Sequence, residues 1–221
     1  MTQEMRPPPR RSPGPGERKL DAERSRRLLI EAAKDEFAAK GFAGARVQDI
    51  ADRAGVNKQL INYYFGGKEG LYCELGRQWM AQEAGFNGPD LPLDELLLLY
   101  LRHTLDDPRG TRLEAWRGLT EDPKDLPIGP REDLSNLEDR QADGELAEDL
   151  DPAAVMLMMH ALTAAPIVLP NAVRRIYGLD PESPEFRERY IEGVRRIVRR
   201  LGTGAAKDAG PTAEDAGPTE A

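Results

Sequence analysis

The chain has 221 residues, which is enough for one large or two small domains with a hydrophobic core. Its single cysteine excludes an intrachain disulfide and fits a reducing cytoplasm, and no apolar run is long enough to span a bilayer. The formal charge of −8 is unevenly distributed: Lys and Arg number five against two Asp and Glu in residues 1–20, ten against ten in residues 21–83, and 16 against 27 in residues 84–221. We therefore expect a cytoplasmic protein, and the local charge of its first part does not exclude a polyanionic partner there despite the net charge.

Residues 1–20 are rich in Pro, Gly and Arg, a composition that cannot bury a core and that predicts a disordered basic arm. Two interpretations of this arm stay open. It is either an unstructured leader or a segment that follows the DNA backbone or enters the minor groove.

A first helix is predicted from residue 21 to residue 40. Leu29, Ala33 and Phe37 recur on one helical face. Gly41 follows, and glycine is the residue best able to take the left-handed conformation that ends a helix.

Residues 45–65 predict two short helices joined by a tight turn. Gly55 can end the first helix, and the side-chain oxygen of Asn57 can cap the second, which turns Ile61 inward. The first helix has its apolar residues at helical spacing: Val47, Ile50, Ala51 and Ala54.

The other face of the second short helix carries a cation, two amides and an aromatic hydroxyl, with no acidic group: Lys58, Gln59, Asn62 and Tyr63. Such a face suits the DNA major groove, where base edges present both donors and acceptors. The segment therefore predicts a helix-turn-helix that binds double-stranded DNA.

A fourth helix is predicted from Lys68 to about residue 83, because Leu71, Leu75 and Trp79 lie at helical spacing. Gly and Pro residues between 85 and 92 then mark the expected boundary between a head and a body.

The body is predicted to be helical throughout, and no strand pattern is found. Asp151-Pro152 and Ser183-Pro184 each combine a cap with a first-turn proline, whereas Pro166 and Pro170 should break or kink a long apolar stretch. Residues 203–221 predict a disordered tail. Helices are expected near residues 92–106, 109–120, 131–142, 152–164, 170–177 and 184–201.

A series of short segments carries a family resemblance: Leu29-Ile30-Glu-Ala32-Ala33, Phe37, Lys40-Gly41-Phe42, Val47-Gln-Asp49-Ile50-Ala51, Ala54-Gly55-Val56-Asn57-Lys58, Tyr63-Tyr64-Phe65 and Lys68-Glu69-Gly-Leu71-Tyr72. On these residues the head, residues 21–82, resembles the TetR family of bacterial transcriptional regulators. The resemblance implies an all-α homodimer, in which a three-helix head is joined by a linking helix to a larger helical body, residues 83–202, for ligand binding and dimerisation.

The resemblance also implies which residues contact DNA: Gln48, Lys58, Gln59, Leu60, Asn62, Tyr63 and Lys68. The two lysines and the tyrosine suit phosphates, which position a protein without reading sequence. Gln59 and Asn62 suit adenine, because an amide donates and accepts at once, and Gln48 suits either partner. The two heads of a dimer would enter successive major grooves roughly 34–36 Å apart.

Two of these positions depart from the family pattern, which has a tyrosine in place of Asn62 and a small hydroxyl residue in place of Leu60. Leu60 either touches a thymine methyl group or packs into the core of the head. Asn62 is either a base reader or an ordinary amide on the helix surface.

For the body, the resemblance implies a small-molecule effector and dimerisation through the last two long helices. Aromatic, Met and His side chains are candidates for a ligand pocket, although such residues also form plain cores: Trp79, Tyr100, His103, Trp116, Met156, Met159 and His160. Apolar and aromatic side chains are candidates for the dimer interface or, alternatively, for intramolecular core: Val155, Phe186, Tyr190, Val194, Ile197 and Leu201.

The expected function is that of a sequence-specific, ligand-responsive repressor that binds a palindromic operator. A DNA-binding protein that senses no small molecule, either constitutive or controlled by a partner, is the alternative. No nucleophile motif, phosphate-binding glycine loop or Cys/His metal spacing is found, so we expect no enzyme, cofactor or metal site.

Overall fold

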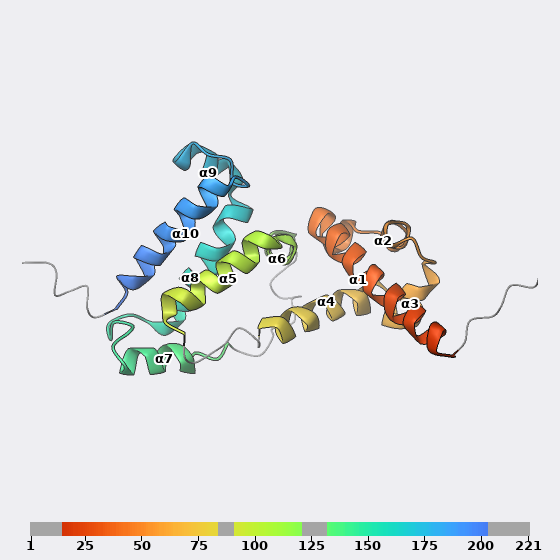
Figure 1. Cartoon of the computed structure of the whole chain (residues 1–221), viewed down its shortest axis with the longest axis horizontal. Coiled ribbons are helices and arrows are strands. Elements are labelled where there is room, and N and C mark those ends of the chain that lie inside the picture. The colour runs from red at the N-terminus through yellow and green to blue at the C-terminus, as the bar shows by residue number, and fades with distance from the viewer. Residues whose placement is uncertain (1–14, 84–90, 121–131, 203–221) are drawn as a thin grey trace, which may run out of the picture. The chain divides into compact units, whose positions relative to one another are not determined.

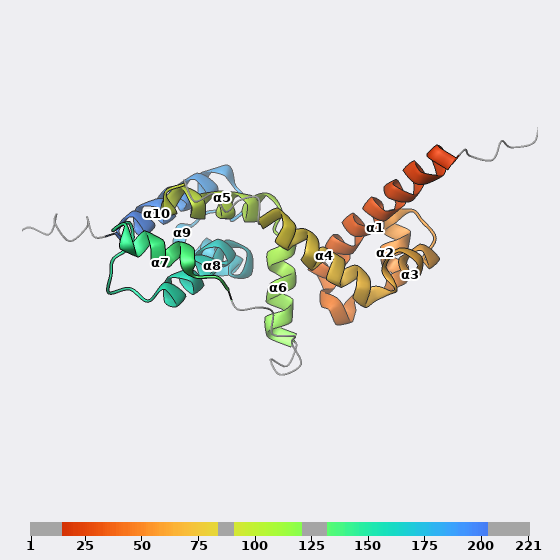
Figure 2. The same ribbon diagram turned by 90° about the horizontal axis from the view of Figure 1, so that it is seen from below.

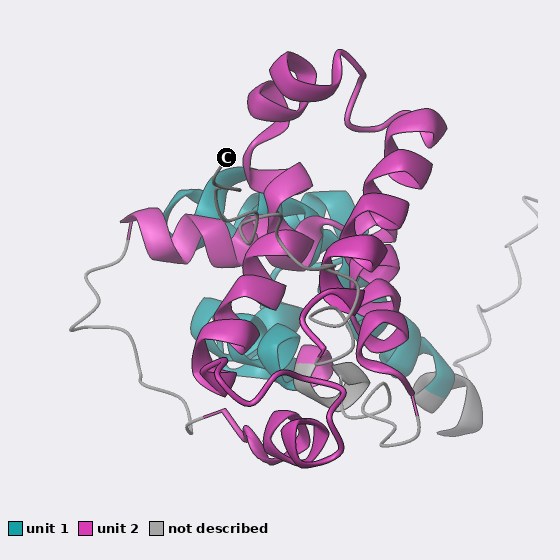
Figure 3. Ribbon diagram, turned by 90° about the vertical axis from the view of Figure 1, so that its left-hand side faces the viewer, with its two compact units in different colours: residues 1–77 teal, residues 78–221 magenta. Residues whose placement is uncertain are grey.

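The computed structural model describes residues 15–83, 91–120 and 132–202, and every regular element in these ranges is a helix (Figures 1 and 2). The chain divides into two compact units, residues 1–77 and residues 78–221 (Figure 3). The prediction of an all-α protein is confirmed. The predicted tail and residues 1–14 of the predicted arm lie outside the described residues.

The first unit contains α1 (Pro15–Gly44), α2 (Val47–Ala54), α3 (Gln59–Phe65) and most of α4 (Lys68–Glu83). α1 begins before the predicted residue 21, because Glu, Arg, Lys, Leu and Ala favour a helix once the proline-rich run has ended. Gly41 takes a φ of 67° and a ψ of 175°, so the regular helix is interrupted where the sequence predicts its end.

The core of the first unit fixes the short helix α3. Phe37 of α1, Ile50 of α2 and Ile61 of α3 are fully buried. The ring of Phe37 also meets the edge of the Tyr72 ring of α4, with 5.3 Å between centroids. Because Ile61 holds one face of α3 against this core, the opposite face is directed to solvent.

The second unit is built around α5, which packs against α8 and α10. Its helices are α5 (Leu93–Asp106), α6 (Arg109–Thr120), α7 (Ser135–Ala142), α8 (Pro152–Val168), α9 (Pro170–Tyr177) and α10 (Pro184–Arg199). Their ends lie close to the predicted ones. Two predicted caps are present: the Asp151 carboxylate accepts a hydrogen bond from Ala153 N, and the Ser183 hydroxyl accepts one from Phe186 N.

The sequence predicts a break or kink of the apolar stretch at Pro166 and Pro170; the break occurs directly before Pro170, whereas Pro166 lies inside α8 and does not end it. A proline has no N–H to donate to the carbonyl four residues earlier, here that of Leu162. The Tyr190 hydroxyl of α10 donates to this carbonyl instead, at 2.7 Å. The helix therefore runs on to Val168, and the chain bends by 88° between α8 and α9, where Leu169 precedes the second proline.

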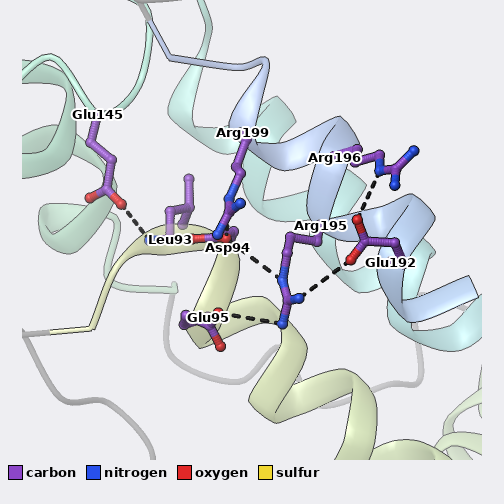
Figure 4. A network of polar contacts seen from close by, with 8 residues as sticks. All are labelled: Leu93, Asp94, Glu95, Glu145, Glu192, Arg195, Arg196 and Arg199. Atoms are coloured by element: carbon purple, nitrogen blue, oxygen red, sulfur yellow. Dashed lines mark hydrogen bonds and ion pairs between the residues drawn. The ribbon is translucent and has the colours of Figure 1, made fainter. Parts of the chain in front are cut away.

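A group of charged side chains holds the first turn of α5 against α10 (Figure 4). Asp94 is buried and accepts a hydrogen bond from Arg199 Nε at 2.7 Å. Arg195 pairs with Glu95 at 3.4 Å and with Glu192 of its own helix at 3.3 Å. These contacts join the beginning of α5 to the last turns of α10.

None of the described helices by itself has the length and apolar composition to cross a membrane. Helices α8 and α9 reach that composition only when they are counted together across their bend.

Candidate DNA-binding interface

The turn between α2 and α3 has the hydrogen bonds that a helix-turn-helix needs. Gly55 is left-handed, with a φ of 66°, and Val56 N donates to Ala51 O at 3.1 Å, which closes the end of α2. The Asn57 carboxamide oxygen accepts a hydrogen bond from Gln59 N at 2.8 Å and so caps α3. The cap predicted from the sequence is confirmed.

The side of α3 opposite Ile61 is open to solvent. Lys58, Gln59 and Asn62 are exposed, and Tyr63 is 79% exposed. Among the described residues, the charged and amide groups of these side chains have no hydrogen-bond or ion-pair partner, so they are available to a ligand. Leu60 is half-buried, which fits both contact with a thymine methyl group and packing into the core of the head.

The other two predicted contact residues already have partners within the head. Gln48 is exposed, and its Nε2 donates to Asp52 Oδ1 at 2.7 Å. Lys68 is half-buried, and its ammonium group lies 4.5 Å from the centre of the Phe42 ring and 3.5 Å from Ala43 O. Lys68 thus joins the beginning of α4 to the last turn of α1.

Ion pairs hold α1 against α2 behind this surface. Glu36 is buried and pairs with Lys40 at 2.6 Å and with Arg53 at 2.9 Å, and Lys40 also pairs with Asp49 at 2.9 Å. The pKa of Glu36 is lowered, above all by the hydrogen bond from Lys40. Burial acts in the opposite direction and raises the pKa, whereas the hydrogen bond from Arg53 lowers it further. A hydrogen bond from Lys40 likewise lowers the pKa of Asp49.

Arg46, the residue that precedes α2, is not among the residues predicted from the sequence to contact DNA. Its side chain is exposed and has no hydrogen bond or ion pair with any described residue. The signal in the sequence is a cation directly before the first residue of α2, where Asp151 and Ser183 supply capping oxygens to α8 and α10.

The candidate pocket residues of the second unit do not all come together. The rings of Trp79 and His103 lie 5.6 Å apart, whereas Met159 belongs to the core. His160 is exposed, and its Nδ1 donates to Met156 O in the same helix at 2.9 Å. Tyr100 is half-buried and Trp116 is 37% exposed.

A pocket of about 520 Å³ opens elsewhere, on α9 and α10, and contains none of the predicted pocket residues. The ring of Tyr177 in its wall lies 5.1 Å from the guanidinium carbon of Arg189. Its lining consists of Ile176, Tyr177, Arg189, Glu192, Gly193 and Arg196.

Half of the candidate dimer residues serve as intramolecular core, the alternative that the sequence left open. Val155, Phe186 and Val194 are buried within the second unit, so they offer no surface to a partner. Ile197 is 48% exposed, and Tyr190 and Leu201 are half-buried. The most exposed large apolar side chain of α8 is instead Leu157, at 72%.

The capped turn, the buried side of α3 and its open polar side together define a helix-turn-helix protein. The family model described as bacterial regulatory proteins, tetR family, matches residues 29–75, and the model described as tetracyclin repressor-like, C-terminal domain, matches residues 81–200. The chain belongs to the TetR family of DNA-binding transcriptional regulators.

Similar proteins agree with this assignment. The HTH-type transcriptional regulator RutR of Escherichia coli K12 is 30% identical over 200 residues, which cover 83% of this chain and 92% of RutR. The HTH-type transcriptional repressor SCO4008 of Streptomyces coelicolor is 29% identical over 192 residues, covering 81% and 98%. The crystal structure of SCO4942 from Streptomyces coelicolor matches with a TM-score of 0.61 and 27% identity, over 78% of this chain and 97% of that one.

Proposed function

We propose that the chain is a cytoplasmic repressor that binds a palindromic operator as a homodimer, with α3 in the major groove. The observation that carries this proposal is the open side of α3, where Lys58, Gln59 and Asn62 are exposed and Ile61 is buried behind them. Amides on such a helix hydrogen-bond to base edges, and the lysine pairs with a phosphate.

Selection of bound duplexes from a random pool tests this function. We expect two inverted half-sites whose centres are roughly one helical turn of DNA apart, because a two-fold dimer presents two equal heads. Placing the selected site between a promoter and a reporter should lower expression when the protein is present. Selection of a single, asymmetric site, or of no site, would contradict the proposal.

The proposed dimer uses the outward sides of α8 and α10, which carry the exposed Leu157 and Ile197. Two helices from each copy would form a four-helix interface, and burial of these side chains would stabilise it. Analytical ultracentrifugation at micromolar concentration should give twice the mass of the 24.5 kDa chain. A monomer under these conditions would rule out this interface.

We also propose a small-molecule effector that binds the second unit near Trp79 and His103, whose rings are in contact range. An effector acts only through different affinities for two arrangements of the protein, and typical coupling changes operator affinity about 5–150-fold. A metabolite panel should contain a compound with such an effect. Equal operator affinity with every compound would favour the constitutive alternative.

A further inference from the structure

Arg46 lies at the beginning of α2, and no carboxylate in the described part of the head forms an ion pair with it. The side chain is exposed and forms neither a hydrogen bond nor an ion pair with a described residue. Asp49, one turn further on, feels its charge but pairs with Lys40 at 2.9 Å. Asp52 accepts its hydrogen bond from Gln48 at 2.7 Å. Both carboxylates of α2 are thus occupied by other residues.

The stability of α2 does not account for an arginine here. The residue at this position has an extended backbone, with φ −112° and ψ 137°, and α2 receives no side-chain cap from it. Asn57, Asp151 and Ser183 do cap α3, α8 and α10 with side-chain oxygens. An arginine has no side-chain acceptor for the first N–H groups of the helix. Its positive charge is also repelled by the positive end of the helix dipole.

A phosphate partner accounts for the arginine. When the second helix of a helix-turn-helix enters the major groove, the first helix crosses the sugar–phosphate backbone. An exposed guanidinium at the beginning of that first helix can bind a phosphate with two parallel hydrogen bonds. The phosphate charge would also compensate the unfavourable placement of the cation.

We infer that Arg46 is a further DNA-contact residue, whose guanidinium group binds a phosphate of the duplex and whose cost to α2 is offset only in the complex. This inference rests on the proposed DNA-binding function. It adds a contact on α2 to those expected from α3, and the contact does not distinguish one base sequence from another.

The test is Arg46→Ser, which removes the charge and supplies a capping oxygen. In the absence of DNA, we expect the melting temperature to rise by about 2–4 °C. Binding to the duplex selected by the wild-type protein and binding to a scrambled duplex of equal length should both weaken. The slope of log affinity against log salt concentration should fall in magnitude by about 0.9 per protomer, the value for one lost phosphate contact.

Two control variants separate this contact from a general charge effect. Arg46→Lys keeps the charge and should keep the wild-type slope. Arg102→Ser removes an exposed arginine of α5 in the second unit and should also keep it. An unchanged slope and affinity in Arg46→Ser, while the wild-type protein binds its duplex, would overturn this inference alone. A lower melting temperature in Arg46→Ser would overturn the assigned cost to α2. A wild-type protein that binds no duplex would overturn the proposed function and this contact with it.

Discussion

Single side chains in and next to α3 have distinguishable roles because they differ in hydrogen-bonding capacity and in their contacts with the rest of the head. Asn62 is exposed and its carboxamide has no partner among the described residues, so it can donate to and accept from one base. Lys58 is equally exposed, but an ammonium group only donates and suits a phosphate without regard to sequence. Lys68, which lies against Phe42, has a structural contact in addition to its predicted role.

Replacing Asn62 by Ala should relax the choice of operator. A good amide–base pair contributes about 1–3 kcal/mol of discrimination between bases. The affinity for the selected duplex, divided by the affinity for a duplex changed at a single base pair, should therefore fall at one position of each half-site. The matched variant Lys58→Ala should instead weaken both duplexes alike. Competition binding with single-base variants measures both effects. If Asn62→Ala kept the wild-type preference at every position, Asn62 would be an ordinary surface amide.

Glu36 should make the stability of the head depend on pH. Its pKa is lowered by Lys40 and Arg53, so the folded state favours the charged form. The stabilisation is fully present above the ordinary value of 4.5 and is lost as the pH falls through the lowered folded value. Hydrogen bonds to charged groups contribute about 1.5–3 kcal/mol, so Glu36→Gln should lower the free energy of unfolding by that order near pH 7.

Thermal unfolding at several pH values measures this effect. The difference between the wild-type protein and Glu36→Gln should shrink in acid, as the wild-type carboxylate becomes protonated. Glu31→Gln is the control, because the ion pair of Glu31 with Lys34 is between partly exposed side chains of one helix. A difference that stays constant with pH would contradict the assigned ion pairs.

At the scale of whole elements, helices and caps follow from local sequence, whereas a helix that depends on a distant partner does not. The order of the helices, the cap by Asn57 and the left-handed Gly55 were all predictable, because they depend on neighbouring residues. The continuation of α8 through Pro166 was not, because the missing donor is supplied by Tyr190 of another helix. The burial of Val155 and Val194 inside their own unit was not predictable either. An apolar stripe has the same sequence pattern whether it packs against its own chain or against a partner.

Removing the Tyr190 hydroxyl should leave the Leu162 carbonyl without a donor. Burial raises the pKa of Tyr190 to about 12, so the hydroxyl remains a donor at neutral pH. Tyr190→Phe should therefore destabilise the protein by about 1 kcal/mol. In a Pro166→Ala background the backbone N–H returns to the helix and the same change should cost less. A double-mutant cycle by urea denaturation tests this coupling, and additive effects would show that the hydroxyl does not replace the proline's missing donor.

At the scale of the whole molecule, operator binding depends on the two heads of one dimer binding the same duplex together. A dimer that dissociates leaves each head with a single half-site and loses the gain in effective concentration that a linked second head provides. Leu157→Glu should cause this loss, because it places a charge in the apolar face of α8 proposed to meet the partner. Leu119→Glu is the control, since this leucine at the end of α6 is 84% exposed and lies outside that face. Sedimentation should show monomers for Leu157→Glu only, and its affinity for the full operator should approach that for an isolated half-site. A Leu157→Glu protein that remains dimeric would place the interface on another surface.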